Sequence, residues 1–342
     1  MAKKAERPAS QAQMLDLITS YWVSQLVRVV AKFGVADVLA RGPMTPAAIA
    51  RKVGAHAPSL ARVLRALASV GVFAETSDGR FRLTPVASAL RRDVPGSLQA
   101  FALMMIDTYN WRGWEKLYEG VRDGEIAFGL AYGQRIFDYL RDHPEEERVF
   151  AASMASLSGV ENPAIARAYD FSALGTLVDV GGAHGHLLAA ILRRHRRLRG
   201  MLFDQPQVVA KAKESGFLAP PAISARCQVV AGDFFAEVPA GADAYIMKYI
   251  IHDWDDARAI QILRNCRAAM APEGRVLVVE NVIRPGKHRD WAKLLDINML
   301  ALTGGLERTR EEFKALFAQA GLRLRRIVPT TAPVSILEAS AA

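Results

Sequence analysis

The sequence lacks the features of a membrane-spanning or a disulfide-rich secreted protein. No apolar run reaches the ~20 residues that a helix needs to cross a bilayer, and the long early run at 21–38 contains three charged residues. The first eight residues, MAKKAERP, have neither the hydrophobic core nor the cleavage site of a signal peptide. Only two cysteines occur, Cys227 and Cys266, as expected for buried, reduced thiols. We therefore predict a cytoplasmic protein with no membrane partner.

The sequence also has little that favours nucleic-acid binding, although its formal net charge is +9. The densest basic cluster, at 193–199, has no aromatic residues between its arginines and lies at the end of a predicted helix. Cations there interact favourably with the helix dipole and with water. We interpret this cluster as a solvated face and predict no nucleic-acid partner. The chain has no internal repeat and no low-complexity segment.

The first part of the chain has the pattern of a winged helix. Helical apolar spacing extends over 12–39, and Thr45-Pro46 and Pro58-Ser59 each open a further helix. A β-hairpin follows, because strand-like residues flank the turn Ser77-Asp78-Gly79. A winged helix can bind DNA or act as a packing module. The candidate recognition helix offers only Arg62 and Arg65 as long polar donors, which favours a dimerisation domain over 1–95.

The remainder divides into a helical region at 96–170 and an α/β region at 171–342. The helical region is rich in methionine and aromatic residues, which form a core or line a cavity for a flat ligand. In the second region, buried strands alternate with helices, a pattern typical of a parallel sheet covered on both faces. The predicted strands are 176–180, 200–203, 227–231, 244–248 and 276–280, with a tail hairpin at 322–329 and 334–339.

A glycine-rich turn follows the first of these strands in the motif LVDVGGAHGHL. Gly181, Gly182 and Gly185 allow a tight turn and a close approach of a ligand to the backbone. In an open parallel sheet, ligands bind at the carboxyl ends of the strands. Asp204 ends the next strand, where a carboxylate can accept hydrogen bonds from both hydroxyls of a ribose. Up to this point NAD and other adenosine ligands are equally compatible.

The later strand ends favour one ligand. Asp233, in GDFF, can accept a hydrogen bond from an adenine amino group, and Phe234 can pack against the ring. Lys248 ends the fourth strand, in IMKYIIHDW. Each early strand end thus carries a polar group suited to one compact ligand made of adenosine and an amino acid. We predict S-adenosylmethionine (SAM) as the cofactor.

The motifs LVDVGGAHGHL, FDQP, GDFF, KYIIHDW, GRVLVVE and DINMLALTGGLERT follow one another in the order found in a known family. Across nearly its whole length, the chain resembles the class I SAM-dependent small-molecule O-methyltransferases. That family includes plant caffeate-type, acetylserotonin and bacterial antibiotic-tailoring enzymes. The resemblance implies a Rossmann-like SAM domain and a winged-helix domain that forms a homodimer. It also implies an aromatic or polyketide-like acceptor that is methylated on a hydroxyl group.

The resemblance also implies roles for individual residues. His252 matches the general base, with Asp253 beside it, and Glu280 and Glu307 match the acids that brace it. The implied cofactor residues are Asp179, Gly181, Gly182, Asp204, Gln205, Gly232, Asp233, Phe234 and Lys248, and the implied substrate residues are Met154, Asn298 and Met299. The family often has glycine and leucine where this chain has Ala183 and Gln205, and neither change removes the acid predicted to bind the ribose.

The chemistry requires such a base, because a phenol with a pKa near ~10 is a poor nucleophile at neutral pH. A histidine can take its proton as attack begins, and the sulfonium is already activated, so no metal is predicted. Asp255 and Asp256, next to Asp253, are interpreted as helix-capping residues rather than metal ligands. Methyl transfer to nitrogen or carbon, SAM-assisted decarboxylation or hydroxylation, and a winged-helix regulator remain alternatives.

Overall fold

The computed structural model describes residues 9–342, so the N-terminal MAKKAERP lies outside the described residues. The chain divides into two compact units, and each takes residues from two separate stretches of the sequence. The first unit contains residues up to 111 together with 143–157, and the second contains 112–142 and 158–342. The region 96–170, expected to be a separate segment, is therefore shared between the two units. Within 9–342, no helix is long and apolar enough to cross a membrane.

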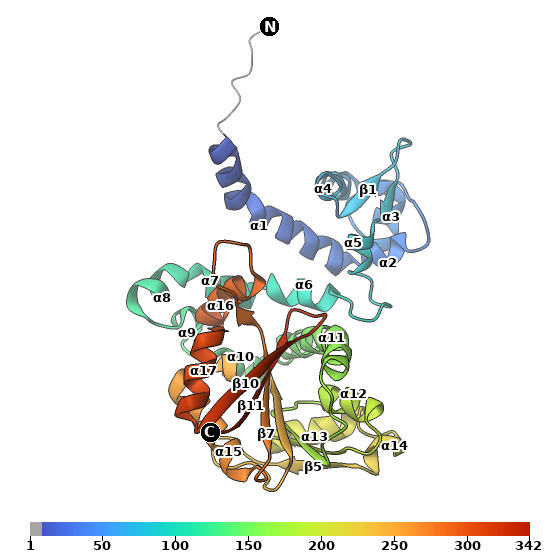
Figure 1. Ribbon diagram of the computed structural model, residues 1–342. Helices are drawn as coiled ribbons and strands as arrows, with labels where there is room; N and C mark the ends of the chain where they lie inside the picture. The colour runs from blue at the N-terminus through green and yellow to red at the C-terminus, as the bar shows by residue number, and fades with distance from the viewer. Residues whose placement is uncertain (1–8) are drawn as a thin grey trace. The chain divides into compact units, whose positions relative to one another are not determined.

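The first unit contains the expected winged helix (Figure 1). Helix α3 (Pro46–Val53) is capped by the hydroxyl of Thr45, and α4 (Ala57–Ser69) leads into the antiparallel pair β1 (Phe73–Glu75) and β2 (Phe81–Leu83). Leucines of α4 and aromatic residues of both strands share one buried core. The remaining elements are α1 (Ala9–Phe33), α2 (Val35–Leu39), α5 (Pro85–Ser88), α6 (Gln99–Met105), the start of α7 (Thr108–Glu115) and the first half of α11 (Pro144–Ala168).

One helix predicted over 12–39 is in fact two. Gly34 has a φ of 67°, in the left-handed region, and separates α1 from α2. A residue with a Cβ is strained in that conformation, so glycine allows the break at little cost. The apolar periodicity continues across Gly34, which is why the sequence pattern alone indicated a single helix.

The second unit is built on a seven-stranded sheet in the order β10-β11-β7-β6-β3-β4-β5. The five strands β3 to β7 are parallel, and β11 joins the edge of β7 antiparallel. Their bounds are β3 (Thr176–Val180), β4 (Arg199–Asp204), β5 (Cys227–Ala231), β6 (Ala244–Lys248), β7 (Arg275–Glu280), β10 (Leu322–Pro329) and β11 (Ser335–Ala341). The predicted strands are confirmed to within two residues at each end.

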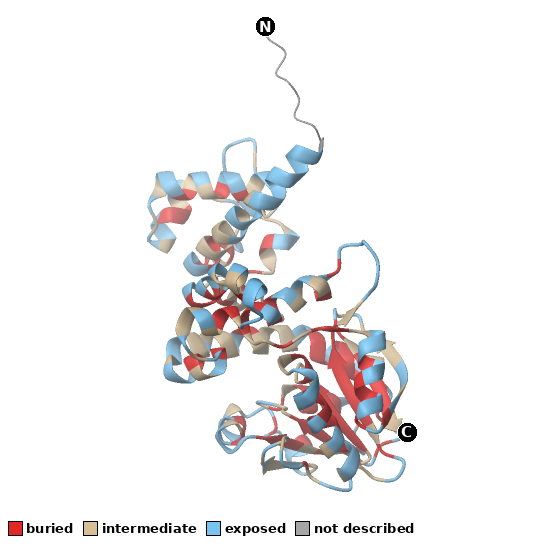
Figure 2. Ribbon diagram, turned by 90° about the vertical axis from the view of Figure 1, so that its left-hand side faces the viewer, coloured by how far each residue is buried: buried red, intermediate tan, exposed pale blue. Residues whose placement is uncertain are grey.

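Buried residues fill both faces of this sheet. Its strands are mostly red, the colour of buried residues, in Figure 2. Successive residues of a strand point to opposite faces, and Leu177 and Val178 accordingly belong to two different core clusters. Besides the end of α7 and the second half of α11, this unit contains the helices α8 (Leu117–Asp123), α9 (Ala127–Tyr132), α10 (Ile136–Asp142), α12 (His186–Arg194), α13 (Pro206–Ser215), α14 (Pro221–Ser224), α15 (Asp256–Ala269), α16 (Trp291–Leu302) and α17 (Arg310–Gln319). Residues of α12 pack on one face of the sheet, and residues of α15 and α17 pack on the other.

The strand order reverses at β3, which lies between β4 and β6. The carboxyl ends of these neighbouring parallel strands meet at one edge of the sheet, where ligands bind in open α/β folds. A second, two-stranded parallel sheet pairs β8 (Val282–Ile283) with β9 (Arg308–Thr309). Because β8 follows β7 directly, this short pairing brings the segment 305–309 to the end of the main sheet.

Candidate active site

His252 lies in a short turn after the central strand β6. The 3-10 turn η1 (Ile251–Asp253) begins three residues after Lys248, and His252 is only 7% exposed. The carbonyl oxygen of His252 accepts a hydrogen bond of 2.9 Å from the backbone N–H of Leu306. Gly305 approaches that oxygen so closely that an added Cβ atom would overlap with it. Glycine is therefore needed at 305 for the segment to dock on the turn.

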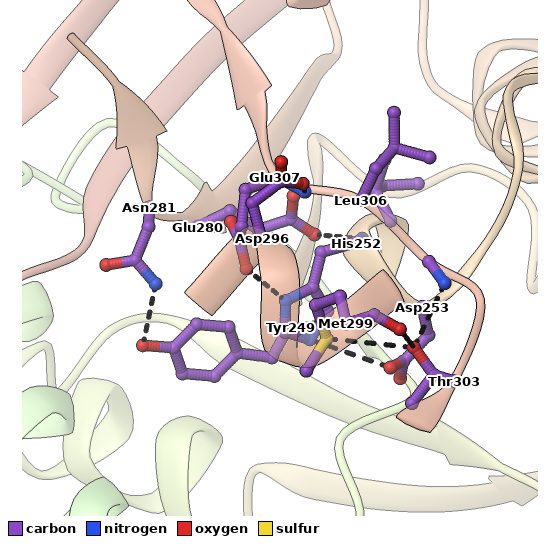
Figure 3. Close-up of polar contacts among 12 residues, drawn as sticks. Tyr249, His252, Asp253, Glu280, Asn281, Asp296, Met299, Thr303, Leu306 and Glu307 are labelled. Atoms are coloured by element: carbon purple, nitrogen blue, oxygen red, sulfur yellow. Dashed lines mark hydrogen bonds and ion pairs between the residues drawn. The ribbon is translucent and has the colours of Figure 1, made fainter. Parts of the chain in front are cut away.

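Three carboxylates surround His252 (Figure 3). The Oε1 atom of Glu307 lies 2.7 Å from Nδ1 of the imidazole. Glu280, at the end of β7, accepts a hydrogen bond of 3.0 Å from the backbone N–H of His252. The Oδ1 atom of Asp253 lies 3.8 Å from Nε2, beyond hydrogen-bond distance. Glu307 therefore orients the ring, whereas Glu280 holds the main chain that carries it.

These charges change the titration of the site. Burial disfavours the imidazolium, but Asp253, Glu307 and Glu280 outweigh it and raise the pKa of His252 to about 9. Burial is the main cause that raises the pKa of Glu280 to about 7, and the neighbouring Glu307 adds to it. Because Nδ1 donates to Glu307, Nε2 is the nitrogen that can exchange a proton with a bound molecule.

The glycine loop after β3 packs tightly against neighbouring side chains. A Cβ atom at Gly181 would overlap with Ile250, and one at Gly182 would overlap with Leu202 and with the carboxyl group of Asp179. Asp179 is 1% exposed, and its Oδ2 atom has no hydrogen-bond partner among the described residues. Burial, with a contribution from Asp204, raises the pKa of this carboxyl group to about 7. A buried acceptor that has no partner within the described residues suits a hydrogen-bond donor of a bound molecule, such as the amino-acid end of a cofactor.

The acids predicted to bind the adenosine follow the next strands. Asp204 accepts hydrogen bonds from the backbone N–H groups of Ala183 and Gln205, at 2.8 and 2.7 Å, which ties the end of β4 to the glycine loop. Gly232 continues from β5 and donates its N–H to the carbonyl of Asp204 at 3.0 Å. Asp233 is exposed and caps its own turn by accepting from the N–H of Phe235 at 2.8 Å. The parallel pairing of β3, β4 and β5 therefore brings these predicted cofactor residues together.

Lys248 has a role that its sequence position did not predict. Its ammonium group donates to Ser158, Glu161 and Asn162 on α11, at 3.0, 2.9 and 3.0 Å. These three bonds use all three hydrogens of the ammonium group. A contact between Lys248 and the cofactor stays a prediction, and the side chain itself joins β6 to α11.

The predicted substrate residues lie on two helices. Asn298 and Met299 lie on α16 and are each 8% exposed. The Oδ1 atom of Asn298 accepts a hydrogen bond of 3.3 Å from the indole N–H of Trp114. Met154 lies on α11 in the part that belongs to the first unit, whereas the other predicted site residues belong to the second unit.

Comparison with known proteins gives matches over most of the chain. The model of an O-methyltransferase domain matches residues 114–323, and the model of an O-methyltransferase dimerisation domain matches residues 15–93. The phenazine O-methyltransferase of Lysobacter antibioticus is 46% identical over 95% of each chain. This chain belongs to the O-methyltransferase family. The resemblance inferred from the motifs is confirmed.

Solved structures of the family agree with the fold. A calicheamicin-biosynthesis methyltransferase in its S-adenosylhomocysteine-bound form superposes with a TM-score of 0.90 at 39% identity, covering 99% of this chain and 100% of that one. A neocarzinostatin-biosynthesis O-methyltransferase, solved with SAM and a hydroxylated naphthoic acid, gives a TM-score of 0.77 at 37% identity, covering 93% and 96%. The expected α/β architecture with an N-terminal dimerisation domain is confirmed.

Arg308 is a residue of this O-methyltransferase site that sequence reasoning missed. It is 1% exposed and donates to the carbonyl oxygens of Ile251, Trp254 and Leu306, at 3.2, 3.0 and 3.4 Å. It also pairs with Asp256 at 2.8 Å. The guanidinium thus binds the first residue of the turn that carries His252, Ile251, and the residue just after the turn, Trp254. Arg308 follows Glu307 in the sequence, and this position was the one indication that it belongs to the site. An arginine shortly before a helix is usually interpreted as an exposed surface residue.

Replacing Glu307 with glutamine is expected to lower the pKa of His252 from about 9, because the isosteric amide removes one of the charges that favour the imidazolium. Titration of ¹⁵N-labelled histidine by NMR measures this pKa, and a His252 variant assigns the signal. Glu311→Gln removes an exposed carboxylate from α17 and serves as the control. If His252 has the same pKa in Glu307→Gln and in the wild type, Glu307 is not the charge that stabilises the imidazolium.

Arg308→Lys is expected to lower the free energy of unfolding, because one ammonium group cannot reach three carbonyl oxygens and a carboxylate at once. Leaving buried acceptors unpaired costs about 1–3 kcal/mol each. Urea denaturation measures the loss, and Arg310→Lys at a neighbouring exposed position is the control. Equal stability of the two variants would show that the buried contacts of Arg308 are dispensable.

Proposed function

We propose that this O-methyltransferase transfers a methyl group from SAM to a hydroxyl group of a polycyclic aromatic molecule, with His252 as general base. The observation that carries the proposal is the 2.7 Å contact between Nδ1 of His252 and Glu307. It fixes the tautomer in which Nε2 is free to accept a proton. The family and the acids at the strand ends support SAM as the methyl donor. The names of the relatives support an aromatic acceptor.

SAM, when bound, supplies a methyl group that its sulfonium already activates. Its amino-acid end would lie at the loop of Gly181 and Gly182, where the buried Oδ2 atom of Asp179 has no hydrogen-bond partner among the described residues. Asp204 retains lone pairs for the ribose hydroxyls after accepting two backbone N–H groups. Solved relatives whose titles name SAM or S-adenosylhomocysteine support this assignment.

The base acts on the acceptor hydroxyl. With SAM bound, the acceptor oxygen would take the methyl group as its bond to the sulfonium sulfur breaks, and S-adenosylhomocysteine would leave. The hydroxyl proton passes to Nε2 of His252, and Glu307 stabilises the imidazolium that forms. Glu280 keeps the turn in place through the main chain during this transfer. The reaction needs the neutral imidazole at its start, so kcat/KM is expected to rise with pH towards the pKa of His252, about 9 in the free enzyme.

The acceptor class comes from the relatives. They are named as a phenazine O-methyltransferase, a 6-O-methyltransferase of mitomycin biosynthesis and a dihydroxy-methylnaphthoate 7-O-methyltransferase. We therefore propose a fused-ring phenol as the acceptor of this chain. Methylation of nitrogen is the second candidate, because other relatives are named as a riboflavin-analogue N,N-dimethyltransferase and a phenazine N-methyltransferase. An aromatic amine attacks through its lone pair and needs little help from a base.

His252→Ala separates these two reactions. Methyl transfer to a hydroxyphenazine is expected to fall by about 10²–10⁴-fold, the usual worth of general-base assistance, whereas transfer to the matching aminophenazine falls much less. Radiolabelled methyl transfer measures both rates, and calorimetry checks that SAM affinity is retained. His288→Ala, at a half-exposed ring, is the control. Unchanged transfer to the hydroxyl in His252→Ala would remove His252 from the role of base.

We also propose a homodimer formed through the first unit. The dimerisation-domain model covers 15–93, and α1 carries large apolar side chains that are exposed in the single chain. Leu17, Ile18 and Trp22 are 63, 61 and 57% exposed. An apolar helix face of this kind favours a protein–protein contact.

Ile18→Glu is expected to convert the dimer to a monomer, because a carboxylate in an apolar interface is left without a partner. Light scattering coupled to size-exclusion chromatography measures the mass. Val121→Glu on α8, at a position 65% exposed, is the matched control. A dimer that persists in Ile18→Glu with the same dissociation constant would place the interface elsewhere.

A further inference from the structure

Tyr249 has an unusual backbone conformation next to the proposed base. Its φ is 56°, and Ala183 is the other non-glycine residue with a positive φ among residues 9–342. The left-handed conformation is unfavourable for an L-residue with a Cβ atom. Such strain persists only when the surroundings hold it, and it is concentrated at functional sites. The conformation of Tyr249 therefore requires a compensating set of contacts.

Glu161 supplies part of that compensation. Its Oε1 atom accepts a hydrogen bond of 2.8 Å from the phenol of Tyr249, and its Oε2 atom accepts one of 2.9 Å from Lys248. In a regular strand, two successive side chains point to opposite faces. The left-handed turn at Tyr249 lets both residues reach one carboxylate that is itself 5% exposed. Asn281 adds a longer bond of 3.4 Å to the same phenol (Figure 3).

The anchored ring lies against the imidazole. The centroids of Tyr249 and His252 are 5.0 Å apart and their planes differ by 25°, which is a stacked arrangement. Glu307 holds the Nδ1 edge of the same imidazole. A hydrogen bond at one edge leaves the ring free to tilt about that bond, and a ring stacked on its face opposes this tilt.

We propose that Tyr249 is a positioning residue that fixes the plane of the His252 imidazole, with Glu161 as its anchor. This inference rests on the proposed role of His252 as general base. The strained backbone at 249 serves to present the tyrosine ring to the imidazole and the phenol to α11 at the same time. Without the tyrosine ring, Nε2 of His252 keeps its protonation state but is poorly oriented towards the acceptor hydroxyl. Removal of the hydroxyl proton then slows more than the binding of SAM and acceptor weakens.

Two variants separate the ring from the phenol. Tyr249→Leu removes the stacked ring, and kcat for a hydroxyphenazine is expected to fall about 10- to 100-fold, as for a misaligned catalytic group. Tyr249→Phe keeps the ring and loses the bond to Glu161, so its kcat lies between those of wild type and Tyr249→Leu. The KM for SAM is expected to stay the same in both. Tyr118→Leu, at a tyrosine that is 73% exposed, is the matched control.

A second measurement does not depend on activity. In ¹⁵N-histidine NMR, the Nδ1 proton of His252 is expected to exchange faster with water in Tyr249→Leu than in wild type. A wild-type kcat together with unchanged exchange in Tyr249→Leu would overturn the positioning role. A fall in kcat matched by an equal loss of SAM affinity would also overturn it, because that result indicates general damage to the fold. If His252→Ala retains full activity, the base assignment fails, and the exchange rate still tests whether Tyr249 orders the ring.

Discussion

The site depends on the docking of one short segment, Gly305–Arg308, against the turn that carries His252. Each residue of the segment makes a different contact. Gly305 allows the approach, Leu306 donates its N–H to the carbonyl of His252, Glu307 holds the imidazole, and Arg308 grips the carbonyls of Ile251 and Trp254. These bonds hold the turn in place. The parallel pairing of β8 with β9 sets the register of the segment.

The charges at this site balance one another in a buried space. Three acidic side chains, Asp253, Glu280 and Glu307, lie around His252, and the guanidinium of Arg308 lies nearby. Buried carboxylates are costly unless they are paired or protonated. The imidazolium relieves that cost, which is why the pKa of His252 is raised to about 9 although burial alone would lower it. The acidic side chains around His252 thus stabilise the positive charge that the imidazole gains when it accepts a proton. Glu280 and Glu307, which hold the turn in place, also favour the imidazolium.

The sequence was informative wherever a motif ended a strand. Asp179 lies one residue before the end of β3, Asp204 ends β4 and Asp233 follows β5. Parallel strands bring their carboxyl ends to one edge of the sheet, so the pattern and the topology predicted that these acids share that edge. The position of His252 followed from its motif. The sequence did not predict that Glu280 binds the backbone N–H of His252. A carboxylate that binds a backbone N–H and one that binds an imidazole ring have the same sequence signature. The same holds for Arg308, whose burial depends on the two-residue pairing of β8 with β9.

Tyr249 was hidden for a different reason. Positive φ angles are usually foreseen from glycine or asparagine, and at this position a tyrosine adopts one inside an apolar stretch. The strain of about 1–2 kcal/mol is comparable to the gain of about 1.5–3 kcal/mol from one hydrogen bond to a charged group. Glu161 makes two such bonds, one with Lys248 and one with Tyr249. The hydrogen bond to this carboxylate on α11 therefore offsets the strain of a conformation that the local sequence disfavours. The backbone preference of Tyr249 is overridden by a tertiary contact with a residue almost ninety positions earlier in the chain. This part of the site could therefore be found only in the folded structure.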